Sequence, residues 1–301
     1  MKDIILITGA SGLIAKELSK RLEKNYTVRF LTRNKKHDNE FEWNIKEQTI
    51  DEAALEGVTH IIHLAGANIS EKRWTEDRKK ELIASRVDSA ALLSATLKKK
   101  NIRLKSFISA SGINYYGTKT TEKIFNENDD PGSDFLSKVV VLWEKAADQF
   151  RENDLAERVV KIRTAVVLSE KDGALKKMLP TIRMGIGSPL GTGKQYMPWI
   201  HIEDICGIYE YALQNNDMNG AFNAVSPQHT TNKNLTEKIA EVLKKPLFMP
   251  NVPGFVLKLI FGELADALLE GSRASSDKIH KAGFHFQYPD LKKALENLLH
   301  R

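Results

Sequence analysis

Short apolar runs alternate with longer amphipathic stretches along the first half of the chain. The β-branched run at residues 4–8 is too brief for a helix, whereas residues 13–24 place their apolar side chains at helical spacing. Further apolar runs predict strands at 26–32, 41–44, 59–64, 105–109 and 158–168, and amphipathic stretches predict helices at 75–99 and 135–153. Strands that alternate with helices in this order predict an α/β fold with a doubly wound parallel sheet.

The second half of the chain has a different pattern. Residues 185–194 are rich in glycine and predict a loop, which either wraps a ligand or forms a surface turn. Amphipathic helices are predicted at 230–243 and 253–270. We expect the apolar residues of the second helix, among them Phe255 and Leu259, to pack on a smaller lobe that this half of the chain builds beside the sheet.

The segment between the first strand and the first helix reads Thr8-Gly9-Ala10-Ser11-Gly12. Gly9 permits a sharp turn, Gly12 lets backbone N–H groups approach a pyrophosphate, and the N-terminus of the next helix favours negative charge. The third small residue, where helix and strand pack closely, is Ala15. The residues that we expect to hold a dinucleotide here are Gly9, Ser11, Gly12, Leu13 and Ile14.

Arg33 follows the second strand, where dinucleotide folds select between cofactors. Its charge and fork of donors suit a 2′-phosphate, so we expect NADP in preference to NAD, the alternative being an exposed arginine with no specific role. Trp43 is expected either near the adenine ring or in the core. Leu64, Ala65 and Gly66 close the fourth predicted strand, where small side chains leave room for the cofactor.

Charge and composition argue against several kinds of partner. The net charge is +6, but the basic residues occur in short runs without interleaved aromatic side chains, so we expect no nucleic acid. The predicted helix at 253–270 carries Lys258, Glu263 and Asp266 instead of a basic strip, so we expect no membrane partner. The first apolar run is too short for a signal peptide, which predicts a cytoplasmic protein. The eight histidines show no ligand-like spacing, and we expect no metal site.

Four motifs together resemble the extended short-chain dehydrogenase/reductase superfamily, and within it the NAD-dependent epimerase/dehydratase group. These are Thr8-Gly9-x-x-Gly12, His63–Gly66, Ser109–Ser111 followed by Tyr115–Gly117, and Trp199–Asp204. Six further segments are similar to a subgroup described as epimerase family proteins, sugar-nucleotide epimerases with a C-terminal domain of unknown function. They are Lys72–Trp74, Arg163–Leu168, Gly191–Gly193, Asn223–Pro227, Leu268–Arg273 and Ala282–Phe284.

The resemblance implies a Rossmann-like NADP-binding domain at residues 1–170, which also receives strands and helices from about 196–226. Residues 171–301 would mainly form a C-terminal α/β substrate lobe. The implied activity is that of an NADP-dependent epimerase or oxidoreductase, with NAD as the alternative cofactor. It acts by hydride transfer on a small molecule such as a sugar nucleotide. The implied assembly is a monomer or a homodimer.

Active members of this superfamily use a Tyr-x-x-x-Lys motif, in which the lysine and the cofactor ribose lower the tyrosine pKa so that the phenolate can move a proton, while a serine holds the substrate oxygen. Lys138 matches the lysine, but Asp134 stands in the place of the tyrosine. A carboxyl group has a reference pKa of about 3.9, against about 10 for a phenol, so it is a poor proton donor at neutral pH. Gly112 stands where the serine is expected, and Ser111 lies one residue before it.

Two interpretations follow from these replacements. In the first the protein is an enzyme, in which Lys138 orients the nicotinamide ribose and Ser111, Tyr116 or Tyr115 handles the substrate; Tyr116 has packing under its loop as the alternative role. In the second it is a non-catalytic NADP(H)-binding regulator or scaffold, because Asp134 replaces the tyrosine.

Overall fold

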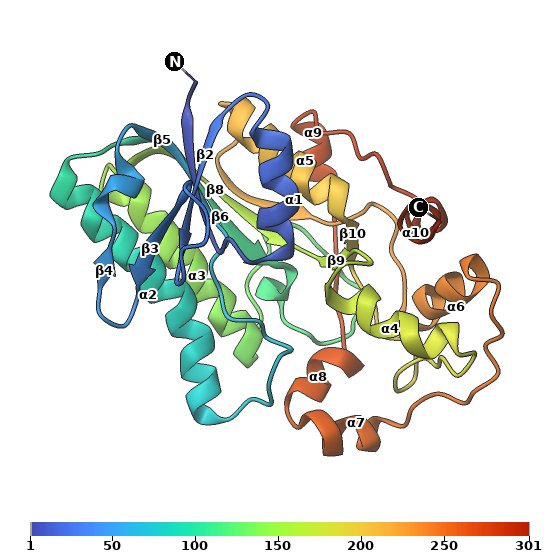
Figure 1. Cartoon of the computed structure of the whole chain (residues 1–301). Helices are drawn as coiled ribbons and strands as arrows, with labels where there is room; N and C mark the ends of the chain where they lie inside the picture. The colour runs from blue at the N-terminus through green and yellow to red at the C-terminus, as the bar shows by residue number, and fades with distance from the viewer. Residues whose placement is uncertain (1, 301) are drawn as a thin grey trace.

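An eight-stranded sheet forms the centre of the computed structural model, which describes residues 2–300 (Figure 1). Its strand order is β11-β8-β6-β5-β1-β2-β3-β4, and every neighbouring pair is parallel except β3 and β4. The strands are β1 (Ile4–Thr8), β2 (Thr27–Thr32), β3 (Glu40–Asn44), β4 (Thr49–Ile50), β5 (Val58–His63), β6 (Leu104–Gly112), β8 (Ala156–Thr164) and β11 (Gly220–Ala224). The order reverses between β1 and β5, which is where such sheets bind ligands.

Helices cover both faces of this sheet, because alternate residues of its buried strands point to opposite sides. Ile5 and Ile7 of β1 belong to a core with α1 (Leu13–Leu22) and α5 (Ile202–Gln214). Leu6, between them, belongs to a second core with α2 (Glu76–Lys100) and α3 (Phe135–Glu152). The doubly wound α/β fold predicted from the sequence is therefore confirmed.

The rest of the chain builds a smaller lobe beside the carboxyl ends of the strands (Figure 1). Its helices are α4 (Gly173–Arg183), α6 (Asn232–Val242), α7 (Gly254–Phe261), α8 (Leu264–Leu269), α9 (Asp277–Lys281) and α10 (Leu291–Leu299). Two short parallel pairs join the lobe to the sheet domain: β9 (Val166–Leu168) with β10 (Trp199–His201), and β7 (Ile124–Phe125) with β12 (Arg273–Ala274). Two 3₁₀ turns, η1 (Glu52–Leu55) and η2 (Ile113–Tyr116), complete the described elements. None of the helices in residues 2–300 has the length and apolar character needed to cross a membrane.

Two predicted elements are wrong in their extent. The strand expected at 158–168 divides at Ala165, whose N–H still bonds to Ala224 of the sheet, whereas Val166 already bonds to Pro198. The helix expected at 253–270 divides at Gly262, which has a left-handed φ of +61° that ends α7. The expected packing of α7 on the lobe is also wrong for its first apolar residues, since Phe255 is 73% exposed.

Candidate functional site

The glycine turn after β1 is shaped by the strand beside it. Gly9 has a φ of +73°, and a Cβ atom there would lie 2.9 Å from the carbonyl oxygen of Leu64. Gly12 donates its N–H to Gly9 O at 2.9 Å, and a Cβ on Gly12 would lie 3.2 Å from that oxygen. No side chain caps α1, which leaves its first N–H groups without a side-chain acceptor. Ala15 is fully buried, as the close packing of helix and strand requires.

A chain of buried hydroxyl and imidazole groups fixes this turn to β5. Thr8 Oγ1 accepts the N–H groups of Leu64 and Ala65, both at 3.0 Å, and lies 3.0 Å from His63 Nδ1. With both acceptor positions used, the threonine proton points to Nδ1, so Nε2 carries the imidazole proton toward Ser89 Oγ at 3.2 Å. Burial lowers the pKa of His63 to about 4, which keeps this ring neutral.

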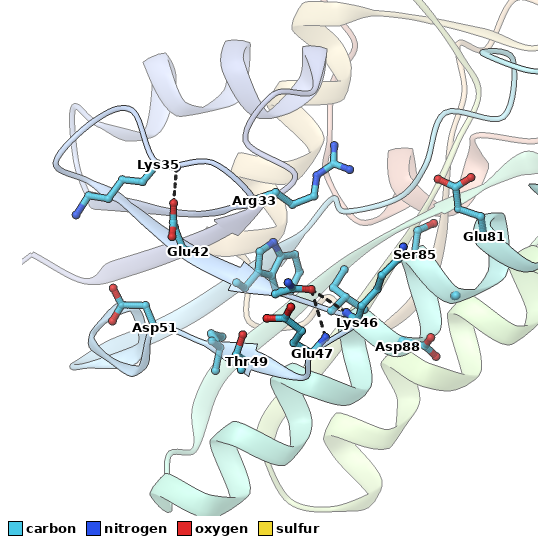
Figure 2. Close-up of a pocket in the computed structure, with 15 residues that line it drawn as sticks. Arg33, Lys35, Glu42, Lys46, Glu47, Thr49, Asp51, Glu81, Ser85 and Asp88 are labelled. Atoms are coloured by element: carbon cyan, nitrogen blue, oxygen red, sulfur yellow. Dashed lines mark hydrogen bonds between the residues drawn. The ribbon is translucent and has the colours of Figure 1, made fainter.

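Arg33 lines a pocket of about 750 Å³ between the β3–β4 hairpin and α2 (Figure 2). Its guanidinium is exposed and, within residues 2–300, has no carboxylate within 4.0 Å. Figure 2 shows Arg33 extending toward α2, away from Lys35 and Glu42. Trp43 in the same wall is only 6% exposed, so it serves both the core and the pocket.

Gly66 is small for a reason that the sequence did not reveal. A Cβ on Gly66 would lie 3.0 Å from Cζ of Arg86, a buried residue of α2. The guanidinium donates to Leu82 O at 2.8 Å and Ala67 O at 3.2 Å, and it covers the Trp143 ring at 4.8 Å. Burial lowers the pKa of Arg86 to about 10, so it stays charged at neutral pH. Among the described residues no carboxylate pairs with it.

The Ser111 hydroxyl is hydrogen-bonded to a buried ion pair. Its hydroxyl donates to Glu144 Oε1 at 2.6 Å. Glu144 also accepts two bonds from Arg163, from Nε at 2.7 Å and from Nη2 at 2.9 Å. These contacts tie β6, β8 and α3 together, and both charged groups are desolvated but mutually satisfied. A substrate oxygen would meet a serine whose proton is already engaged.

Tyr116 is held by the same network. Its hydroxyl donates to Asn223 Oδ1 and accepts from Arg163 Nη1, both at 2.9 Å. Burial raises the pKa of Tyr116 to about 12, which makes it a poor proton-transfer group at neutral pH. These contacts favour the packing role that the sequence left open. Tyr115 beside it is half-buried, with the Arg163 guanidinium 3.4 Å from its ring centre.

Asp134 begins α3 as its N-cap. Oδ1 accepts the N–H of Ser137 at 2.9 Å, and Oδ2 accepts the N–H of Thr118 at 2.7 Å and its hydroxyl at 3.2 Å. Lys138, one turn later, donates its backbone N–H to Asp134 O at 3.0 Å, but its ammonium group is exposed and makes no hydrogen bond or ion pair within the described chain. The structure thus places a capping carboxylate where the superfamily motif has a phenol, and leaves the lysine free.

Sequence reasoning missed the three buried charges of this region, Arg86, Glu144 and Arg163. Arg86 had a usable signal, because it interrupts the apolar stripe that Leu82 and Leu93 define on α2. The pairing of Glu144 with Arg163 had none, since it joins a helix to a strand across 19 residues. In residues 2–300 no group of three or more His, Cys, Asp or Glu side chains is arranged to hold a metal ion.

Comparison with known proteins finds family matches along most of the chain. Residues 5–225 match the model of the NAD dependent epimerase/dehydratase family, and residues 252–298 match a domain of unknown function, DUF1731. Epimerase family protein Mb2239 of Mycobacterium bovis is 34% identical over 297 residues, which is 97% of this chain and 96% of that protein.

Two solved structures extend the comparison to three dimensions. Human epimerase family protein SDR39U1 (isoform 2), crystallised with NADPH, aligns with a TM-score of 0.89 and 30% identity over 99% of both chains. The nucleoside-diphosphate sugar epimerase of Corynebacterium glutamicum aligns with a TM-score of 0.79 and 26% identity, over 99% of this chain and 58% of that one.

Proposed function

Since this chain belongs to the NAD-dependent epimerase/dehydratase family, we propose that it binds NADP(H) and transfers hydride with a small or nucleotide-linked substrate. The observation that carries the proposal is the open glycine turn after β1, with Arg33 free at the end of β2. The NADPH in the human relative's structure and the nucleoside-diphosphate sugar epimerase among the solved structures support the cofactor and the substrate class.

The pyrophosphate would lie at the turn, against the first N–H groups of α1. Their partial positive charge and their lack of intrahelical acceptors suit an anion. Gly9 and Gly12 would leave room for the pyrophosphate at the turn. Side chains at these two positions would crowd Leu64 O and Gly9 O respectively. Ser11, Leu13 and Ile14, which are exposed or half-buried beside the turn, would contact the same group.

The adenosine end would occupy the pocket beside Trp43, with its 2′-phosphate at Arg33. Five carboxylates also line this pocket: Glu47 and Asp88 make no hydrogen bond or ion pair through their side chains in the described residues, whereas the other three have partners. Glu42 accepts the N–H of Lys35, Asp51 caps η1, and Glu81 pairs with Arg78. Arg33 is therefore well placed to attract a phosphate.

The nicotinamide end would lie along Leu64, Ala65 and Gly66, with Lys138 donating to its ribose. Bound NADP(H) supplies the hydride acceptor or donor. The proton that must accompany the hydride needs a group other than Asp134, whose oxygens accept three donors as a helix cap. Of the three candidates that the sequence suggested, Ser111 and Tyr116 are engaged by the network around Glu144 and Arg163. Tyr115 is half-buried, and its hydroxyl makes no hydrogen bond in the described residues, so it would be the group to move the proton.

This engagement favours a second candidate function, an NADP(H)-binding regulator or scaffold without turnover. The two candidates share the cofactor site and differ only in what happens at its nicotinamide end. We place the enzyme first, because the family model that matches residues 5–225 is that of an epimerase/dehydratase family.

Calorimetry with NADPH and NADH, followed by a turnover assay, separates the candidates. The assay records NADPH absorbance with a panel of sugar nucleotides, aldehydes and quinones. We expect tight NADPH binding, weakened in Lys138→Ala, and turnover of at least one panel member. Binding without any turnover would move the assignment to the regulator, and absence of NADPH binding would remove both candidates.

A further inference from the structure

Exposed apolar side chains gather on one side of the C-terminal lobe. Of the nine large hydrophobic residues that are exposed in the described chain, seven lie between residues 184 and 260. Phe255, Leu259 and Ile260 project from α7 with 73%, 76% and 54% of their surface exposed. A patch of this kind on a folded chain commonly marks a contact surface.

Three segments form this surface, which we call the apolar face: the end of α4 at 183–186, residues 244–253, and α7. The first two approach each other, because a Cβ on Gly185 would lie 3.7 Å from Pro246 Cγ. The chain just after the first segment also bonds to the second, since Val252 donates to Pro189 O at 2.9 Å and accepts from Gly191 at 2.8 Å. The third follows directly after Pro253 (Figure 1).

The charges of the apolar face that lack an ion-pair partner in the described residues are positive. Residues 242–262 contain three lysines and no Asp or Glu. Lys244, Lys245 and Arg183 have no carboxylate within 4.0 Å in the described part of the chain. The two segments that carry them are neighbours, because a Cβ on Gly185 would lie only 3.7 Å from Pro246 Cγ. The acidic residues just beyond are paired: Glu263 with Lys79 at 2.8 Å and Asp266 with Lys258 at 3.2 Å.

We propose that the apolar face rests on an anionic lipid surface. Aromatic and aliphatic tips would enter the boundary between headgroups and acyl chains, while Arg183, Lys244 and Lys245 meet lipid phosphates. A second copy of the chain suits the face less well, because a two-fold contact would bring the same unpaired cations together. The sequence predicted no membrane partner because the helix expected at 253–270 has no basic strip. The unpaired cations of the apolar face come instead from the end of α4 and from the segment before α7.

Vesicle sedimentation tests the proposal independently of the cofactor site. The full chain is mixed with vesicles of phosphatidylcholine, or of phosphatidylcholine and phosphatidylglycerol in equal parts. We expect binding to the anionic vesicles only, weakened by salt. The triple variant Arg183→Gln/Lys244→Gln/Lys245→Gln should bind on the order of a hundredfold more weakly, and Phe255→Ser/Leu259→Ser at least about tenfold more weakly.

A matched triple variant, Lys24→Gln/Lys36→Gln/Lys145→Gln, removes the same charge from exposed, unpaired lysines of the sheet domain and should bind like the parent. Unchanged melting temperatures would show that all variants fold. Equal loss in both triple variants would overturn the proposal, as would failure of the parent to sediment with anionic vesicles. A parent dimer that Phe255→Ser/Leu259→Ser dissociates in analytical ultracentrifugation would also overturn it, because the face would then be a subunit contact.

Discussion

The Oδ2 atom of Asp134 lies 2.7 Å from the backbone nitrogen of Thr118, and it closes the loop after Tyr116 onto the first turn of α3. In the superfamily motif the same position carries a tyrosine that moves protons. Here its oxygens hold two backbone N–H groups, so the position contributes to the fold. The consequences of this exchange can be measured.

Replacement of Asp134 should change stability more than activity. Asp134→Ala removes both capping contacts and should lower the free energy of unfolding by about 1–2 kcal/mol. Asp134→Asn retains an acceptor for Ser137 but presents an N–H to Thr118, and should lower it by about half as much. NADPH affinity, and any turnover, should survive Asp134→Asn. Urea titration and calorimetry measure both quantities; loss of turnover at full NADPH affinity would show that the carboxylate is an acid after all.

Arg33 should determine the choice between the two cofactors. Arg33→Ala removes a charge-assisted contact worth about 1.5–3 kcal/mol, which is roughly a ten- to hundredfold loss of NADPH affinity. NADH affinity should hardly change. Lys35→Ala is the matched control, because Lys35 points away from Arg33 in the same pocket wall (Figure 2). Equal weakening for both cofactors in calorimetry would reject the assignment.

Gly12 should be needed for binding and not for folding. Its φ of −71° suits any residue, but a side chain would stand over the turn and close the approach to the helix N-terminus. Gly12→Val should therefore abolish NADPH binding while the melting temperature falls by only a few degrees. Gly9→Val should unfold the turn as well, since φ is positive and Leu64 O lies in the way. A Gly12→Val variant that still binds NADPH would move the pyrophosphate elsewhere.

Replacement of one member of the Glu144–Arg163 pair should be strongly destabilising. Glu144→Gln leaves a buried guanidinium without its counter-ion, which lowers the free energy of unfolding by about 3–5 kcal/mol. The double variant Glu144→Gln/Arg163→Gln should lose less than the sum of the two single variants, because neither charge is then stranded. Denaturant titrations of all three give the coupling energy, and strict additivity would mean that the pair is not desolvated as its geometry implies.

His63 should make stability fall in mild acid. Its pKa in the folded protein is about 4, against 6.5 in the unfolded chain, so below pH 6.5 the unfolded chain takes up a proton that the folded chain refuses. From pH 7 to pH 5 this lowers the free energy of unfolding by about 2 kcal/mol. His63→Gln should remove that part of the pH dependence, whereas His37→Gln, at an exposed position, should retain it. Equal slopes in both variants would contradict the assignment.

The sheet and the cofactor turn could be predicted from sequence because both depend on local patterns. Buried parallel strands read as short apolar runs, and the glycines of the turn stand next to the strand that they end. The division at Gly262 was also available in principle, since a glycine late in a helical pattern is a common stop. The hydrophobic pattern did not indicate whether the apolar side of α7 packs against another part of the chain.

The interior of the candidate site could not be predicted, because its partners are distant in sequence. No residue near Ser111 in the sequence indicates that its hydroxyl will donate a hydrogen bond to Glu144. Likewise, no residue near Gly66 indicates that it will pack against Arg86. Ser111 was assigned because it lies one residue before the position of the expected serine, and Tyr116 because its phenol lies close by in the sequence. Such spacing locates a residue on a loop but does not say which neighbours bond to its hydroxyl. Buried charge networks join elements that only the assembled fold brings together.

The edge strand β11 has a consequence for how such a protein can change over evolution. The chain leaves the sheet after β8, builds part of the lobe, returns with α5 and β11, and leaves again for α6. An exchange of the lobe between two relatives would need joints near residues 165, 199 and 225 at once. A single crossover near residue 165 would instead pair β8 of one relative with β11 of the other, and pack α1 of the first against α5 of the second. We therefore expect the sheet domain and the lobe to diverge together by point substitution, and seldom to be exchanged by recombination.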